Sequence, residues 1–158
     1  MSTTETTSLK EQILPGIESI LARDVTRNEK LFAICEYLDN EVDVFDWTGF
    51  YFADPSGEPM LLLGPYVGEP TDHTRIPFGK GICGQVAESH DTFVVQDVSE
   101  QDNYIACSIH VKSEIVVPIM KGEAFVAQLD IDSHKKDAFT AEHTELLEDI
   151  CELLSSEF

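Results

Sequence analysis

The chain of 158 residues has few basic side chains and lacks any long apolar run. Its 10 lysine and arginine residues face 30 aspartate and glutamate residues, which gives a formal net charge of −20. A surface this acidic repels phosphate backbones and anionic lipid headgroups, so we expect neither nucleic-acid nor membrane binding. No run of about 18 apolar residues is present to cross a bilayer.

Signals for export, for zinc and for nucleotide phosphates are also missing. The N-terminal sequence MSTTETTSLKEQ has no basic segment followed by an apolar one, so we expect no signal peptide and a cytoplasmic location. The four cysteines form no Cys-x-x-Cys pair, and no histidine lies at a convincing ligand spacing, so we expect no bound metal. The glycine-rich segment Gly79–Gly84 lacks the spacing of a phosphate-binding loop and is interpreted as a tight turn before a helix.

The length predicts a single domain over residues 1–158, in which residues 1–7 form a mobile lead. Capping boxes at Ser8–Glu11 and Thr26–Glu29 predict two N-terminal helices, and Thr140 is expected to cap a third near the C-terminus. Pro15 with Gly16 is expected to kink or split the first helix.

The middle of the chain is predicted to form strands joined mostly by short turns, with a short helix after the glycine turn. Short turns favour antiparallel pairing, so the sequence predicts an α+β fold, an antiparallel sheet with helices packed on one face. The expected strands are residues 46–52, 59–67, 75–78, 92–95, 113–120 and 124–132.

Three acidic residues stand in otherwise apolar strands. Glu114 precedes Ile115–Val117, and Asp130 and Asp132 flank Ile131. Because side chains alternate along a strand, Asp130 and Asp132 share one face. Carboxylates crowded in a pocket need a cation, a hydrogen-bond donor or a shared proton, and a substrate ammonium group would satisfy them. The alternative is that both aspartates are ordinary turn residues at the end of a strand.

Two of the four cysteines are candidates for chemistry. Cys35 and Cys151 lie in apolar helical segments and are expected in the core. Cys83 lies in the glycine turn before a helix and Cys107 on a polar loop, which are settings where a thiolate can form. The alternatives are buried, inert thiols or, together with His73, a metal site that has no apparent fourth ligand.

Five blocks follow one another in a recognisable order: DWTGFY (46–51), FGKGICG (78–84), IAC (105–107), SEIVVP (113–118) and LDIDS (129–133). Together they resemble the GAF domains of the free methionine-(R)-sulfoxide reductase type. The resemblance covers about residues 30–155. It implies a GAF-like fold with a ligand pocket on the sheet face opposite the packed helices.

The resemblance further implies a thiol-dependent reduction of free L-methionine-R-sulfoxide to methionine. The residue in the nucleophile's position is Cys107, whose thiolate would attack the sulfoxide sulfur and become a sulfenic acid. Cys83 would condense with it, and an external thiol such as thioredoxin would reduce the disulfide without any bound cofactor.

The same resemblance assigns the substrate-binding side chains. The carboxylates of Glu114, Asp130 and Asp132 would hold the ammonium group and assist protonation of the sulfoxide oxygen. The rings of Trp47 and Tyr51 would wall the pocket around the methyl and sulfur end of the substrate.

The sequence departs from the family pattern near both thiols. His73 stands where the family commonly has a resolving cysteine, 10 positions before Cys83, and Ser108 follows Cys107 where an aspartate is usual. Tyr104 replaces the family's histidine. The alternative function is therefore a non-catalytic GAF module that binds a small amino-acid-like or redox ligand. A third hypothesis is a regulatory partner that forms a homodimer through its N-terminal helices.

Overall fold

The computed structural model describes residues 8–104 and 110–158. Its elements run in the order α1 (Leu9–Leu21), α2 (Arg27–Glu41), β1 (Trp47–Ala53), β2 (Met60–Val67), β3 (Arg75–Pro77), α3 (Gly81–Ser89), β4 (Phe93–Val95), β5 (Ser113–Lys121), β6 (Ala124–Ser133) and α4 (Ala141–Leu154). Short 3-10 turns lie at Val98–Glu100 and Ser155–Glu157. Among the described helices, none is both long enough and apolar enough to cross a bilayer.

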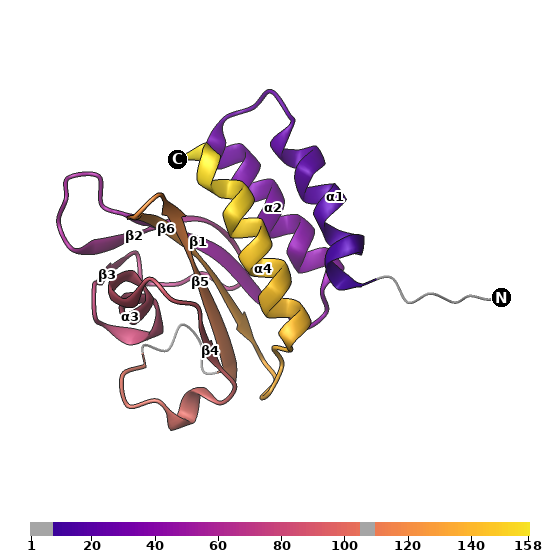
Figure 1. The fold of residues 1–158 in the computed structure, drawn as a ribbon. Helices are drawn as coiled ribbons and strands as arrows, with labels where there is room; N and C mark the ends of the chain where they lie inside the picture. The colour runs from indigo at the N-terminus through magenta and orange to yellow at the C-terminus, as the bar shows by residue number, and fades with distance from the viewer. Residues whose placement is uncertain (1–7, 105–109) are drawn as a thin grey trace.

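The six strands form one sheet in the order β3-β2-β1-β6-β5-β4, and every neighbouring pair is antiparallel. Helices α1, α2 and α4 lie together on one face of this sheet (Figure 1). The short helix α3 covers the opposite face, close to β3. The predicted α+β architecture with an antiparallel sheet is confirmed.

Side-chain alternation along the strands gives the sheet two separate buried layers. On β6, Leu129 and Ile131 belong to the large core under α1, α2 and α4. On β5, Ile115 and Val117 face the same core, whereas Val116 faces the smaller cluster under α3. Since successive side chains point to opposite faces, the residues between these apolar positions are buried on the α3 side.

The predicted helix starts are confirmed by side-chain caps. Ser8 Oγ accepts from Glu11 N at 3.3 Å, and Thr26 Oγ1 accepts from Glu29 N at 3.2 Å. Thr140 caps α4 in a reciprocal box with His143. Each cap satisfies one of the N–H groups that the first turn of a helix leaves without a partner.

Helix α1 runs through Pro15 without a break, so it is not split there. Proline removes one backbone hydrogen bond, but Ile13 and Ile17 on either side are buried and hold the helix against its neighbours. Gly16 has no Cβ, which leaves room for the ring of Tyr37. The Tyr37 hydroxyl donates to the Ile13 carbonyl at 3.3 Å.

The glycine turn sets the position of α3 on the sheet. Gly79 has φ +88°, a left-handed conformation that other residues rarely adopt. Its N–H donates to the Gly84 carbonyl at 2.8 Å. A Cβ on Gly84 would lie 2.6 Å from the Pro77 carbonyl oxygen, so only glycine lets α3 approach β3 this closely.

The variant Gly84→Ala is therefore expected to destabilise the fold by about 1–3 kcal/mol, because backbone atoms rather than a flexible side chain must move. Urea unfolding followed by circular dichroism measures this change. Glu88→Ala, on the exposed side of the same helix, is the control and should stay within about 0.5 kcal/mol of the parent. Equal midpoints for the two variants would contradict this account of α3.

Candidate functional site

Helix α3 and the sheet enclose a small cluster of polar side chains between them. Cys83 comes from the first turn of α3, Glu114 from β5, and Asp130 and Asp132 from β6. Glu114 lies directly opposite Asp132 in the β5–β6 register. The predicted placement of the two aspartates on one face is confirmed, and they lie inside the strand rather than in a turn at its end.

The thiol and two of the carboxyl groups are in direct contact. Cys83 Sγ lies 3.2 Å from Asp130 Oδ2 and 3.8 Å from Glu114 Oε2. The side chains are almost inaccessible to solvent, since Cys83, Glu114, Asp130 and Asp132 are 5%, 4%, 0% and 1% exposed. No amide or hydroxyl group in the described part of the chain donates to Asp130 Oδ1 or to either carboxylate oxygen of Asp132.

Burial shifts the proton affinity of Cys83, Asp130 and Asp132. Desolvation, reinforced by the charges of Asp130 and Glu114, holds the pKa of the Cys83 thiol well above its usual range. Desolvation also raises the pKa of Asp130, although its contacts with Glu114 and Cys83 partly oppose that change. The pKa of Asp132 is raised by burial and by the neighbouring charge of Asp130. Without a cation, the cluster retains protons that exposed groups would lose.

A small cavity lies over this cluster. Its volume is about 10 Å³, which is room for about one water molecule. The residues that line it are Tyr51, His73, Ile76, Lys80, Gly81, Ile82, Cys83, Glu114 and Asp130. The Tyr51 hydroxyl donates to the His73 carbonyl at 2.8 Å, which ties β1 to the segment before β3.

The two predicted aromatic residues occupy different places. Tyr51 lines the cavity and is completely buried. Trp47 lies next to it, with 6.5 Å between ring centroids, and stacks on Tyr66 at 5.2 Å. The Trp47 indole N–H donates to the Glu69 carbonyl at 3.0 Å. Trp47 therefore supports Tyr51 from the side and is not among the residues that line the cavity.

Cys107 lies outside the described residues, as does Ser108. The described chain just before this segment is attached to the turn of α3. Asn103 Oδ1 accepts from Gly81 N at 2.8 Å, and Asn103 Nδ2 donates to the Gly79 carbonyl at 2.8 Å. The described chain therefore stops within a few residues of the cavity.

The other two cysteines are core residues, as predicted. Cys35 is fully buried with its Sγ 3.7 Å from the Pro65 carbonyl oxygen. Cys151 is 3% exposed, and its Sγ lies 3.8 Å from the Val117 carbonyl oxygen. Burial raises the pKa of both thiols, so neither is a ready nucleophile.

Sequence reasoning missed several residues that line the cavity. Lys80 and Gly81 lie in the glycine turn that the sequence singled out, but they were interpreted only as turn residues. Ile76 comes from β3, whose side-chain direction cannot be read from so short a strand. His73, which departs from the family pattern in the sequence, is also one of the residues that line the cavity.

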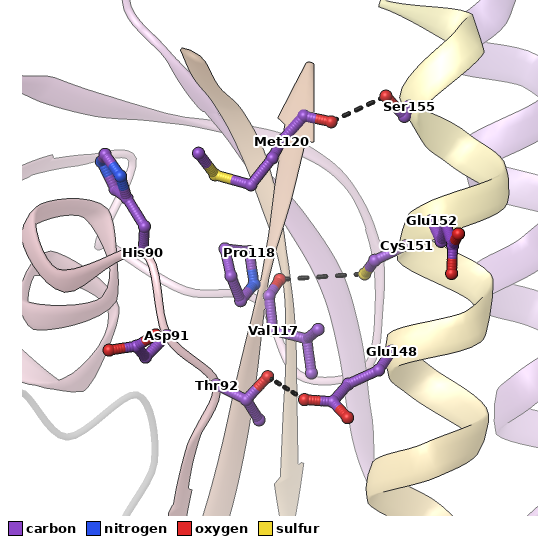
Figure 2. A pocket seen from close by; sticks show the side chains of 10 residues that line it. All are labelled: His90, Asp91, Thr92, Val117, Pro118, Met120, Glu148, Cys151, Glu152 and Ser155. Carbon is purple, nitrogen blue, oxygen red and sulfur yellow. Dashed lines mark hydrogen bonds between the residues drawn. The ribbon is translucent and has the colours of Figure 1, made fainter. Parts of the chain in front are cut away.

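A second, larger hollow of about 420 Å³ lies between the end of α3, β5 and α4 (Figure 2). Two hydrogen bonds join groups in its wall: Ser155 Oγ donates to the Met120 carbonyl at 2.7 Å, and Thr92 Oγ1 donates to Glu148 at 2.7 Å. The Cys151 thiol faces the Val117 carbonyl across the same hollow (Figure 2). This hollow gathers no cluster of reactive groups comparable to that around Cys83.

Fold and site together define a class of protein in which an antiparallel sheet carries a buried polar cluster under a short helix. Residues 26–156 match the family model described as GAF domain. The chain belongs to the GAF domain family.

Two relatives show how far the sequence similarity extends. GAF domain-containing protein A of Dictyostelium discoideum is 36% identical over 146 residues, which is 92% of this chain and 90% of that protein. The free methionine-R-sulfoxide reductase of Saccharomyces cerevisiae is 38% identical over 120 residues, which is 75% of this chain and 66% of the yeast enzyme.

A solved structure gives the same relationship in three dimensions. The free methionine-R-sulfoxide reductase of Neisseria meningitidis, in complex with its substrate, superposes with a TM-score of 0.90 at 33% identity. The match covers 100% of this chain and 93% of that one. The predicted resemblance to this branch of GAF domains is confirmed.

The raised pKa of Asp132 makes the stability of the ligand-free protein depend on pH. An unfolded aspartate loses its proton near pH of about 3.9, whereas the folded residue holds it to higher pH. Over that window the folded state binds more protons, so its free energy of unfolding falls as pH rises, by up to about 1.4 kcal/mol per pH unit. We therefore expect the stability of Asp132→Asn relative to the parent to increase as pH rises above about 4.

Denaturant titrations at a series of pH values measure this difference. The matched control is Asp24→Asn, which changes an exposed carboxylate and should keep a constant offset from the parent. Parallel stability profiles for the parent and Asp132→Asn would show that Asp132 does not hold an extra proton in the folded state.

Proposed function

We propose that this protein is a thiol-dependent reductase of free methionine-R-sulfoxide. The observation that carries the proposal is the buried contact of Cys83 with Glu114 and Asp130 in a GAF domain. That domain is similar over its whole length to a reductase solved with its substrate. A thiol beside carboxyl groups that retain protons suits a reaction in which a sulfoxide is attacked at sulfur while its oxygen accepts a proton.

The carboxyl cluster has two uses in this reaction. Ionised Glu114, Asp130 and Asp132 attract the ammonium group of a free amino acid, whose N–H groups would supply the donors that Asp130 Oδ1 and the Asp132 oxygens lack. A carboxyl group that stays protonated donates its O–H to the sulfoxide oxygen and makes the sulfur a better electrophile. Tyr51 supplies an apolar ring face for the methyl and sulfur end.

In the first chemical step, Cys107 is the nucleophile. Its thiolate attacks the sulfoxide, the oxygen passes to the Cys107 sulfur as the S–O bond of the substrate breaks, and methionine leaves with its sulfur reduced. Oxygen stays on Cys107 as a sulfenic acid, so the enzyme sulfur is oxidised by two electrons. A proton from the carboxyl cluster compensates the charge that develops on the oxygen.

The second step regenerates the thiols. Cys83 sulfur attacks the sulfenic sulfur, water leaves, and a Cys83–Cys107 disulfide forms. An external dithiol such as thioredoxin reduces that disulfide and returns both thiols. Asp130, in contact with Cys83 Sγ, is placed to take the thiol proton as the new bond forms.

The position of Asn103 supports a role for Cys107 at this site. Asn103 is held by hydrogen bonds to Gly79 and Gly81, and Val111 on the far side is buried in the small cluster under α3. The two described ends of the chain that carries Cys107 therefore both lie on the site's face of the sheet. Only 4 positions separate Cys107 from Asn103.

His73 at the cavity favours a second candidate function. It stands where the resembled reductases commonly have a resolving cysteine, and it lines the cavity directly. A GAF module that binds methionine sulfoxide or a similar zwitterion without reducing it would keep Glu114 and Asp130 and lose turnover. Calorimetry with free methionine and its sulfoxides distinguishes this binding module from the enzyme.

Replacing Cys107 by serine is expected to abolish methionine formation, because a hydroxyl cannot accept the oxygen by this route. The assay mixes purified protein with free methionine-R-sulfoxide and dithiothreitol and measures methionine. Cys35→Ala, which alters a buried thiol of the helical core, should retain activity. Undiminished product from Cys107→Ser would remove Cys107 from the mechanism, and binding without product from the parent would favour the non-catalytic module.

The resolving role of Cys83 makes a separate prediction about the oxidised protein. One turnover without reductant should leave a Cys83–Cys107 disulfide, which peptide mapping by mass spectrometry detects as one linked peptide pair. This requires Cα atoms within about 7 Å of each other. In Cys83→Ser the sulfenic acid should persist and react with a sulfenic-acid reagent. Free thiols at both positions after turnover would exclude this pairing.

A further inference from the structure

Cys83, Glu114 and Asp130 also form a group of donor atoms of the kind that binds metal ions. We propose that Cys83, Glu114 and Asp130 bind a thiophilic divalent cation, represented by Zn²⁺, with one coordination position left for water or another ligand. Sulfur and oxygen donors from α3, β5 and β6 converge on one point from three directions. Three protein ligands and one open position are the usual arrangement of an accessible zinc site.

The spacing of the donor atoms fits tetrahedral coordination. Zinc bonds of about 2.3 Å to sulfur and about 2.1 Å to oxygen give ligand–ligand edges of about 3.4–3.6 Å. Cys83 Sγ lies 3.2 Å from Asp130 Oδ2 and 3.8 Å from Glu114 Oε2. All three donor atoms lie within 4.8 Å of one another. The two sulfur–oxygen distances therefore match two edges of a tetrahedron after shifts of a few tenths of an ångström.

Unpartnered carboxylate oxygens around this face point independently to a cationic ligand. Asp130 Oδ1 and both carboxylate oxygens of Asp132 are buried and accept no hydrogen bond from an amide, hydroxyl or thiol group of the described residues, so that carboxyl groups, Glu114 among them, are their polar neighbours. Asp132 lies on the same face of β6 as Asp130 and directly opposite Glu114. Buried carboxyl oxygens without donors are costly, and a bound cation offsets that cost for the whole group.

The donor set selects the kind of metal. A thiolate ligand favours Zn²⁺ and similar thiophilic ions over Ca²⁺ or Mg²⁺, which prefer oxygen ligands alone. One thiolate and two carboxylates together carry more negative charge than a divalent ion neutralises. The chain's net charge of −20 further attracts cations to the protein. On binding, the metal displaces the proton of the Cys83 thiol and any proton held on the carboxyl groups.

Metal binding would regulate the site. A cation between Cys83 and Asp130 fills the cavity above them and occupies the carboxylates that hold the substrate ammonium group. Its binding does not depend on the proposed function, whereas its inhibition of turnover rests on that function. Zinc is then expected to compete with methionine sulfoxide, and a chelator to restore activity.

Cobalt titration of the full-length, reduced protein tests the ligands directly. Co²⁺ replaces Zn²⁺ in such sites and gives a near-ultraviolet charge-transfer band when a thiolate is bound. We expect one equivalent of Co²⁺ to produce this band and one equivalent of Zn²⁺ to remove it. The reductant in these experiments is a phosphine, because dithiothreitol binds zinc itself.

Four variants separate the site from the other thiols. Cys83→Ser should lose the band, while Cys107→Ser and Cys35→Ala should keep it. Asp130→Asn should bind Zn²⁺ at least about tenfold more weakly in a chelator-competition assay, since loss of even a supporting group costs that much. Circular dichroism of each variant verifies that it is folded.

The outcomes distinguish this proposal from the reductase proposal. Absence of the band in the folded parent, or a band that survives in Cys83→Ser and disappears in Cys107→Ser, overturns the metal site. Methionine formation in chelator-treated protein is measured separately. A chelated enzyme that turns over but binds no cobalt would retain the function and lose the metal site. A protein that binds cobalt and makes no methionine would retain the metal site and lose the reductase function.

Discussion

The strict alternation of side chains along β6 is the constraint on which the rest of the structure depends. Leu129 and Ile131 fix that strand against the helices, and this fixes Asp130 and Asp132 on the opposite face. A slip of one residue would place two carboxyl groups in the main hydrophobic core. The packing of the large apolar core on one face of β6 therefore also fixes the positions of Asp130 and Asp132 on the other face.

Helix α3 converts that polar strand face into a closed site. The glycine turn brings the first turn of α3 against β3 so closely that Gly84 has no room for a side chain. Cys83, the preceding residue, then lies against Asp130 instead of in solvent. Removing water from this contact strengthens every electrostatic interaction within it. The protonation of each of these groups consequently depends on the charge of its neighbours, and a positive charge placed among them would alter all of them together.

Much of the fold could be predicted from the sequence because its signals are local. A few neighbouring residues are enough to predict the helix caps at Thr26 and Thr140. The same holds for the strand around Ile131, where apolar and acidic residues alternate. Pro15 was less informative, since packing of Ile13 and Ile17 keeps α1 continuous where local propensity favours a break. Tertiary contacts decide such positions, and no short window of sequence contains them.

The sequence predicts which residues belong to the site better than it predicts how they are arranged. Acidic residues in apolar strands and a cysteine in a glycine turn are visible in the sequence, and Tyr51, Cys83, Glu114 and Asp130 do meet at one cavity. Trp47 lies beside Tyr51 and outside the cavity because it stacks on Tyr66, a contact between β1 and β2. Lys80 reaches the cavity through the path of the turn, which residue types alone do not specify. Long-range register, rather than composition, makes these distinctions.

The half of β5 that extends beyond β4 has a consequence for how copies of the protein meet. Strand β4 pairs only with Glu114–Val116, and the strand continues to Lys121. Along that stretch Pro118 has no N–H to donate, and the Met120 carbonyl already accepts from Ser155 of the segment that follows α4. An incoming strand would find no donor at Pro118 and would compete with Ser155 for the Met120 carbonyl. This edge is consequently protected against strand addition and the aggregation that follows from it, in a protein whose sheet must otherwise stay rigid around a buried polar site.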